Sequence, residues 1–120
     1  MISKTTLPQQ ALAHAVIAAL LVYTLTLAQA SETAGTRGSS LYALATWAFL
    51  CGLGLSHIIH EWFHFLGAVL SRAAVTLKPS VHPLFFDFEF SANSHKQFLS
   101  LSIGGLLGNV MLLGIAVYLA

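Results

Sequence analysis

Residues 53–70 have the sequence LGLSHIIHEWFHFLGAVL, an apolar run that contains one acid and three histidines. On an α-helix, His60 and His64 are one turn apart on the same face, so both imidazoles can point at one metal ion. Glu61 lies about 100° around the helix from His60, close enough to act on a metal-bound water without binding the metal itself. An acid at the centre of a bilayer costs about 2.5–3.5 kcal/mol, which favours a functional role for Glu61.

The composition of the chain is that of a membrane protein. Of its 120 residues, 57% are hydrophobic and 8% are charged, whereas a soluble domain has about 25% charged residues. The net charge of +1 provides no basic patch for phosphates, which argues against a nucleic-acid partner. The single cysteine, Cys51, excludes an internal disulfide, and we expect it to be a packing residue in an apolar helix.

Three apolar runs predict three transmembrane helices in a single membrane domain, residues 1–120. The expected spans are residues 8–30, 41–71 and 98–120. Each is long enough to cross a hydrocarbon core of about 30 Å, so we interpret the first as a retained helix rather than a cleaved signal peptide. Residues 31–40 form a polar connector and residues 72–97 a longer loop. The second span is so long that it must tilt or emerge from the bilayer.

Charges in the loops predict the orientation of the chain. The amino-terminal segment and residues 72–97 lie on the same side of the membrane and together contain four basic residues, whereas residues 31–40 contain one. The positive-inside rule therefore places the amino terminus and the 72–97 loop in the cytoplasm. The histidine pair is then expected near the cytoplasmic face.

The 72–97 loop contains a predicted strand. Residues 86–90 alternate phenylalanine with acidic residues, which is the period of a strand with one apolar and one acidic face. Residues 74–78 are the candidate partner strand, with Pro79 and Pro83 in the connection. A two-stranded ribbon is marginal in water, so an irregular interfacial loop anchored by its aromatic residues is the alternative. A ribbon would leave an edge that can pair with an extended peptide.

The third span contains two glycines and one polar amide. Gly104 and Gly108 are four residues apart, a spacing that lets another transmembrane helix approach closely. Asn109 can form an interhelical hydrogen bond or act as a donor beside a metal site. We expect the glycine side to pack on the helix that carries the histidines, and Asn109 to face His60 and His64.

Two segments resemble a known family. Residues 60–68, HEWFHFLGA, resemble the signature helix of the site-2 protease family of intramembrane zinc metalloproteases. Residues 105–109, GLLGN, are similar to the Gly-Pro-x-x-Asn motif of that family, with Leu106 where proline is usual. The order of the elements also agrees: a signature helix, a β segment and then the asparagine helix. The resemblance covers about residues 45–120.

The resemblance implies a role for four residues. His60 and His64 would bind zinc, Glu61 would be the general base, and Asn109 would position the substrate or the oxyanion. The substrate would be a transmembrane peptide, which is cleaved near the cytoplasmic face.

The third zinc ligand is absent from this pattern. The family takes an aspartate from a later core helix, whereas these 120 residues contain no such helix, and two imidazoles alone hold zinc poorly. The substitutes within the chain are His57, His82, Asp87 and Glu89. If the 120 residues are the whole protein, we expect neither stoichiometric zinc nor peptidase activity. If they are part of a longer protease, a later segment should supply an acidic ligand.

Other function classes fit some of the same residues. A non-catalytic small subunit of a larger membrane complex would dock through its glycine faces and use its histidines for packing or, at His14 or His57, for binding a pigment. A histidine-box di-iron oxygenase needs several histidine boxes, and the chain has one. In the plainest alternative, His57, His60 and His64 form interhelical hydrogen bonds. We therefore predict an all-α membrane protein with three transmembrane helices and a short β-hairpin, whose function is that of a site-2-protease-like zinc core, truncated or inactive.

Overall fold

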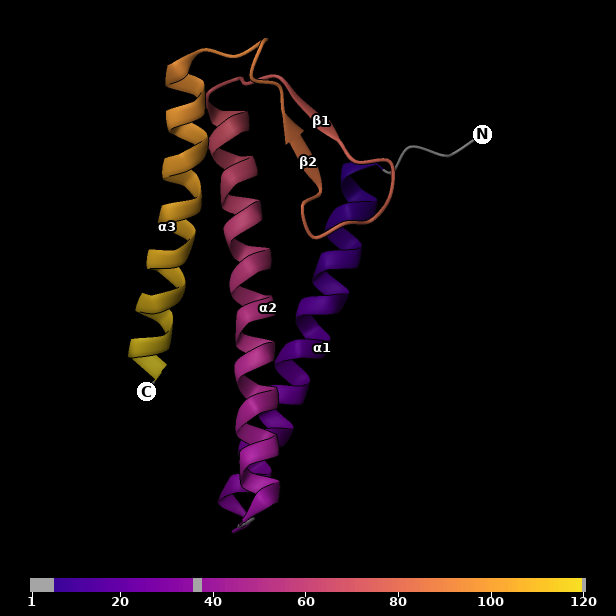
Figure 1. Cartoon of the computed structure of the whole chain (residues 1–120), viewed down its shortest axis with the longest axis vertical. Coiled ribbons are helices and arrows are strands. Elements are labelled where there is room, and N and C mark those ends of the chain that lie inside the picture. Colours follow the sequence, from indigo (N-terminus) through magenta and orange to yellow (C-terminus); the bar gives the residue numbers. More distant parts are fainter. Residues whose placement is uncertain (1–5, 36–37, 120) are drawn as a thin grey trace.

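The computed structural model describes residues 6–35 and 38–119 (Figure 1). In chain order the elements are α1 (Leu7–Thr33), α2 (Ser39–Leu70), β1 (Val75–Leu77), β2 (Phe86–Phe88) and α3 (His95–Leu119). All three helices are long and apolar enough to cross a membrane. The predicted fold class is therefore confirmed: a multi-pass membrane protein with a small hairpin between its second and third helices. Lys4, Arg37 and Ala120, which enter the predicted orientation and the predicted third span, lie outside the described residues.

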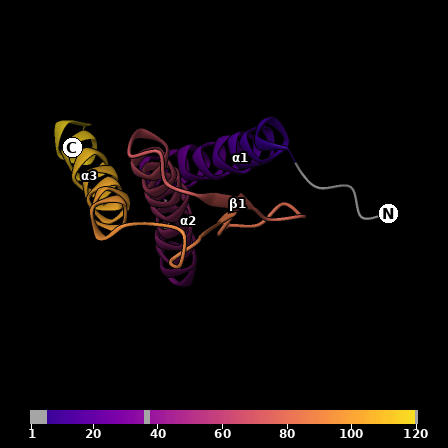
Figure 2. The ribbon, with the colours of Figure 1, turned by 90° about the horizontal axis from the view of Figure 1, so that it is seen from above.

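Helix α2 is the centre of the molecule, because it packs against both of the other helices. Figures 1 and 2 show α1 and α3 on different sides of it. With 32 residues, α2 is about 48 Å long, more than an upright span requires. The candidate metal-binding residues lie in its second half, at the end where the hairpin is attached.

Glycines bring α2 and α3 into close contact. A Cβ atom at Gly104 would collide with the carbonyl oxygen of Phe63 and lie 3.4 Å from Cα of Gly67. A Cβ atom at Gly108 would lie 2.9 Å from Cβ of Phe63. The hydroxyl of Ser100 also donates to the carbonyl of Gly67, at 2.9 Å. The glycine side of α3 is thus packed on the histidine-bearing helix of the same chain, as expected.

Helix α3 begins three residues before the apolar run because its first turn has a capping box. The amide of Gln97 donates to the hydroxyl of Ser94 at 3.3 Å, and the amide of Ser94 donates to the side-chain oxygen of Gln97 at 2.8 Å. The side-chain amide of Gln97 donates in turn to the carbonyls of Ser71 and Arg72. This residue therefore joins the start of α3 to the end of α2.

The hairpin is present, but its strands are shorter than the predicted residues 74–78 and 86–90. The register pairs Val75 with Phe88, Thr76 with Asp87 and Leu77 with Phe86. Strand β2 ends at Phe88 because the chain turns there, with the amide of Ala92 donating to the carbonyl of Glu89. The predicted alternation holds within the strand, since Phe86 is buried and Asp87 is exposed.

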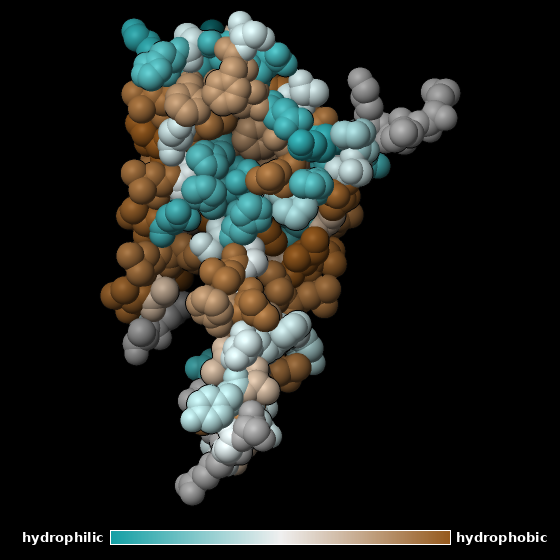
Figure 3. Space-filling model, viewed as in Figure 1, coloured by the Kyte–Doolittle hydropathy of each residue, from teal (hydrophilic) through white to brown (hydrophobic). Residues whose placement is uncertain are grey.

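Buried side chains gather at two places where α1 meets other elements. Cys51 is buried between α1 and α2, where its sulfur lies 3.3 Å from the hydroxyl of Thr24, which agrees with its expected role in packing. The second place is the start of α1, where Gln10, His14 and Phe85 are almost completely buried. Most other helical side chains are exposed and apolar, as the brown surface in Figure 3 shows, which suits contact with lipid.

Candidate metal centre

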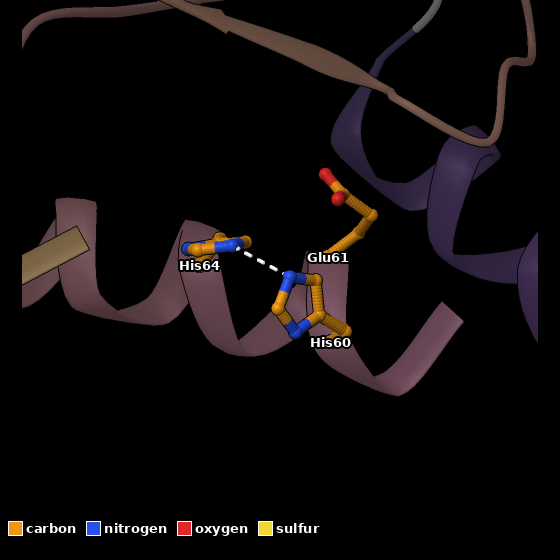
Figure 4. Close-up of side chains that lie close together, drawn as sticks. All are labelled: His60, Glu61 and His64. Carbon is orange, nitrogen blue, oxygen red and sulfur yellow. Dashed lines mark hydrogen bonds between the residues drawn. The ribbon is translucent and has the colours of Figure 1, made fainter. Parts of the chain in front are cut away.

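Helix α2 brings three metal-ligand side chains together. The ligand atoms of His60, Glu61 and His64 all lie within 4.8 Å of one another, and all three side chains are half-buried. Figure 4 shows the two rings meeting at their nitrogens, with the Glu61 carboxylate beside them. Helical spacing accounts for this geometry, because one turn separates the histidines and Glu61 follows the first of them. No other such group occurs among the residues that the structure describes.

Main-chain carbonyls of α3 orient both imidazoles. Nδ1 of His60 lies 3.1 Å from the carbonyl oxygen of Gly105, and Nδ1 of His64 lies 2.7 Å from that of Leu101. A carbonyl oxygen can only accept, so each Nδ1 carries the hydrogen and donates it. Each Nε2 is then left with a lone pair. Metal-binding histidines are commonly held in this way, by an N–H donated to a backbone carbonyl.

The two Nε2 atoms face each other at 2.8 Å. With both Nδ1 atoms donating to α3, both Nε2 lone pairs point into the space between the rings, where a metal ion could be bound by both. Zinc bonds to imidazole are about 2.0–2.1 Å long, and a tetrahedral angle between two of them separates the nitrogens by about 3.3 Å. The rings would thus move apart by roughly half an ångström to hold zinc. The two imidazoles therefore fit two ligand positions of a divalent metal with this small adjustment.

Gly105 provides the space for both rings. A Cβ atom at this position would collide with the imidazole of His64 and would lie 2.8 Å from Cε1 of His60. The sequence pattern singles out Gly104 and Gly108, which contact Phe63 instead. Gly105 is the first residue of the 105–109 motif, but the sequence analysis gives it no role of its own, because a motif does not show which side of α3 faces the histidines.

Asn109 forms no hydrogen bond with the histidine pair in this structure. It follows Gly105 by one helical turn, its side chain is exposed, and the hydrogen bonds to the two rings come from main-chain carbonyls instead. The expectation that Asn109 faces His60 and His64 gains no support from a contact. Its role in positioning a substrate stays a prediction.

None of the four proposed substitutes for a third ligand joins the group: His57, His82, Asp87 and Glu89. Asp87 forms an ion pair with Lys78, with 2.8 Å between the oxygen and Nζ. His82 accepts the amide of Leu84 at its Nδ1, 3.0 Å away. These side chains have local partners in the hairpin and its connection. Within the described residues, Glu61 is the single acid beside the pair.

His14, one of the two candidate pigment ligands, has no free ring nitrogen. The indole N–H of Trp62 donates to its Nδ1 at 3.0 Å. The hydrogen of the neutral ring is therefore on Nε2, which donates to the carbonyl of His82 at 3.0 Å. In this structure His14 therefore links α1 to α2 and to the loop, and pigment binding at His14 or His57 stays a prediction.

Comparison of the chain with protein-family models, curated proteins and solved structures gives no match. The resemblance to the site-2 protease family therefore rests on the two motifs and on the order of the elements.

Proposed function

We propose that this chain is a site-2-protease-like intramembrane metalloprotease core in which His60 and His64 bind zinc. The observation that carries the proposal is the pair of carbonyls on α3. They fix both rings with Nε2 toward a common point, next to a carboxylate.

The residues have distinct roles in this proposal. Zinc, when bound, supplies a Lewis acid that activates a water molecule for attack on a peptide carbonyl. Glu61 accepts the proton of that water, because its carboxylate lies within the same group. Asn109 would bind the substrate, a transmembrane peptide, from the exposed side of α3. The proposed orientation keeps the amino terminus and residues 72–97 in the cytoplasm.

The third ligand in this proposal comes from outside the 120 residues. A patch of hydrophilic side chains lies in the upper half of the face shown in Figure 3, with apolar surface below it and to its left. Polar groups that face lipid are costly, which favours a further protein segment over this patch. That segment would supply the acidic ligand.

A non-catalytic subunit of a larger membrane complex is the second candidate. It is favoured by the fact that none of His57, His82, Asp87 or Glu89 completes the ligand set. In such a protein the contact with partner helices would use surfaces other than the side of Gly104 and Gly108. That side is already covered by α2 of the same chain.

Weak zinc binding by the purified chain in detergent tests the proposal, because two imidazoles without a third ligand hold the ion poorly but more tightly than one imidazole does. Zinc affinity, measured by competition with a chromophoric chelator, should fall at least about tenfold in His60→Ala and stay unchanged in His95→Ala, a histidine remote from the pair. Equal zinc binding by His60→Ala and the parent chain would remove the basis of the proposal.

Glu61→Gln distinguishes the enzyme from the subunit. The enzyme should lose cleavage of a transmembrane peptide in this variant while zinc binding remains. A zinc-binding chain that cleaves no peptide in its native membrane, with or without Glu61, would be the subunit.

A further inference from the structure

The start of α1 is anchored to the loop between the two strands by buried polar groups. Gln10 is 0% exposed and His14 is 3% exposed, although both lie in an apolar helix. They are one turn apart, so their side chains are on the same face of α1. Buried polar groups require hydrogen-bond partners, and here the loop provides them.

The hydrogen bonds hold a short part of the loop, residues 80–82. The side-chain amide of Gln10 donates to the carbonyl of Ser80 at 2.7 Å, and the amide of His82 donates to the side-chain oxygen of Gln10 at 3.4 Å. Nε2 of His14 donates to the carbonyl of His82 at 3.0 Å. Two side chains on adjacent turns thus satisfy three main-chain groups of the loop.

The same histidine joins the loop to α2. Its Nδ1 accepts the indole N–H of Trp62, and the Trp62 ring stacks on Phe85 with 4.5 Å between centroids and an angle of 28°. Phe85, which is 0% exposed, also meets the ring of His14 edge-on at 5.4 Å. His14, Trp62 and Phe85 therefore form a closed triangle between α1, α2 and the loop.

This triangle is attached to the same turns of α2 that carry the candidate metal centre. Trp62 directly follows Glu61 in α2, and Phe85 also contacts Phe65, which directly follows His64. Next to the triangle, a cavity of about 310 Å³ is lined by residues from α1, α2 and the loop, including His14 and His57. The loop is thus attached to the turns of α2 that present the metal ligands.

We propose that His14 is a positioning residue that holds the loop against α2 while it is neutral and releases the loop when it is protonated. An imidazolium carries hydrogens on both nitrogens, so Nδ1 could no longer accept the indole N–H of Trp62. Two donors would then face each other, and a charge would lie in a buried, mostly apolar site. Acid therefore opens the contact between the loop and α2. This proposal concerns the contact between the loop and α2 and goes beyond the proposed function.

Other titratable and charged groups lie around this contact. Helix α2 contributes His57, which lines the same cavity, and Glu61. The hairpin contributes His82 and the ion pair of Lys78 with Asp87. The only charged residue of α1 itself, Glu32, lies about five turns further along the helix. A test must therefore separate His14 from all of these groups.

Fluorescence of Trp62 provides the test, in the full chain with Trp47→Phe so that one indole remains. Acrylamide quenching is measured in detergent between about pH 8 and about pH 5, the range in which histidine commonly titrates. We expect Trp62 to be protected at the higher pH and its quenching constant to rise roughly twofold or more at the lower pH, as the loop opens.

Two substitutions at one position assign the response. His14→Gln keeps an acceptor for Trp62 and a donor for the carbonyl of His82 but does not titrate, so Trp62 should be protected at both pH values. His14→Leu removes both bonds, so Trp62 should be accessible at both. Far-UV circular dichroism confirms that each variant keeps its helices.

The outcomes are decisive because His14→Gln retains every other titratable group. An unchanged acid response in that variant would assign the effect to another group and overturn the proposal. Protection of Trp62 in His14→Leu equal to that of the parent would also overturn it. Neither measurement requires zinc or peptidase activity, so a failure here is distinct from a failure of the proposed function.

Discussion

Gly105→Ala should remove the candidate metal centre while leaving the fold largely intact. The added Cβ would collide with the His64 ring and lie 2.8 Å from Cε1 of His60, whereas carbon atoms pack at about 3.5–4.0 Å. Both rings must therefore move by about an ångström, since the backbone of α3 is fixed by its packing on α2. Such a shift breaks the bonds from Nδ1 to the carbonyls of Leu101 and Gly105, now 2.7 and 3.1 Å long.

Two opposing contributions determine how much the free energy of unfolding of this variant differs from that of the parent chain. Overpacking typically costs about 1–3 kcal/mol, and alanine in place of glycine inside a helix returns about 0.5–1 kcal/mol. The net destabilisation is therefore about 0–2.5 kcal/mol, so most of the protein stays folded. Loss of the carbonyl contacts should by contrast lower the affinity for zinc by about 10–100-fold.

The measurement is zinc affinity in detergent, together with the tautomers of His60 and His64 from long-range ¹H–¹⁵N NMR correlations. Gly114→Ala is the matched control, because a Cβ there has nothing within 4 Å. The control should keep both the affinity and the Nδ1–H tautomers. The reasoning is refuted if Gly105→Ala binds zinc as tightly as Gly114→Ala and keeps both tautomers.

Three further predictions concern packing, the hairpin and topology. Gly108→Leu should lower the free energy of unfolding by about 1–3 kcal/mol or more, because the larger side chain overpacks the contact with α2. Unfolding in a denaturing detergent measures this change, and unchanged stability would contradict the prediction. Asn93→Ala removes three hydrogen bonds that close the hairpin, so its amides should exchange faster, and equal exchange rates would count against this role. In a cysteine-free background, an impermeant thiol reagent applied outside the cell should label a cysteine at Ala34 and spare one at Thr76; the opposite result would reverse the orientation.

The three helices could be predicted from the sequence because the length of an apolar run determines whether a helix can span a membrane. The predicted bounds of the helices and strands are less accurate where polar residues determine the end of an element. Helix α3 starts at His95 rather than at residue 98, because Ser94 and Gln97 extend it by a capping turn. Likewise, strand β2 ends early because the turn at Glu89 interrupts a continuous alternation.

The candidate site was predictable only where it depends on a single helix. The spacing of His60, Glu61 and His64 fixes their relative positions, and the structure brings their ligand atoms together. The contact of Trp62 with His14 depends instead on residues 48 positions apart. It requires the path of the loop between β1 and β2, which no local pattern encodes.

The orientation of the rings is the property that no side-chain pattern can reveal. It depends on two carbonyl oxygens, at Leu101 and Gly105, and every residue type has such an oxygen. Position 101 can therefore vary in side chain without loss of its bond to His64. Position 105 cannot, because its Cβ would occupy the space of the rings. The resemblance directs attention to Asn109, whereas the hydrogen bonds in the structure show that the two imidazoles are held by the backbone of α3 one and two turns earlier.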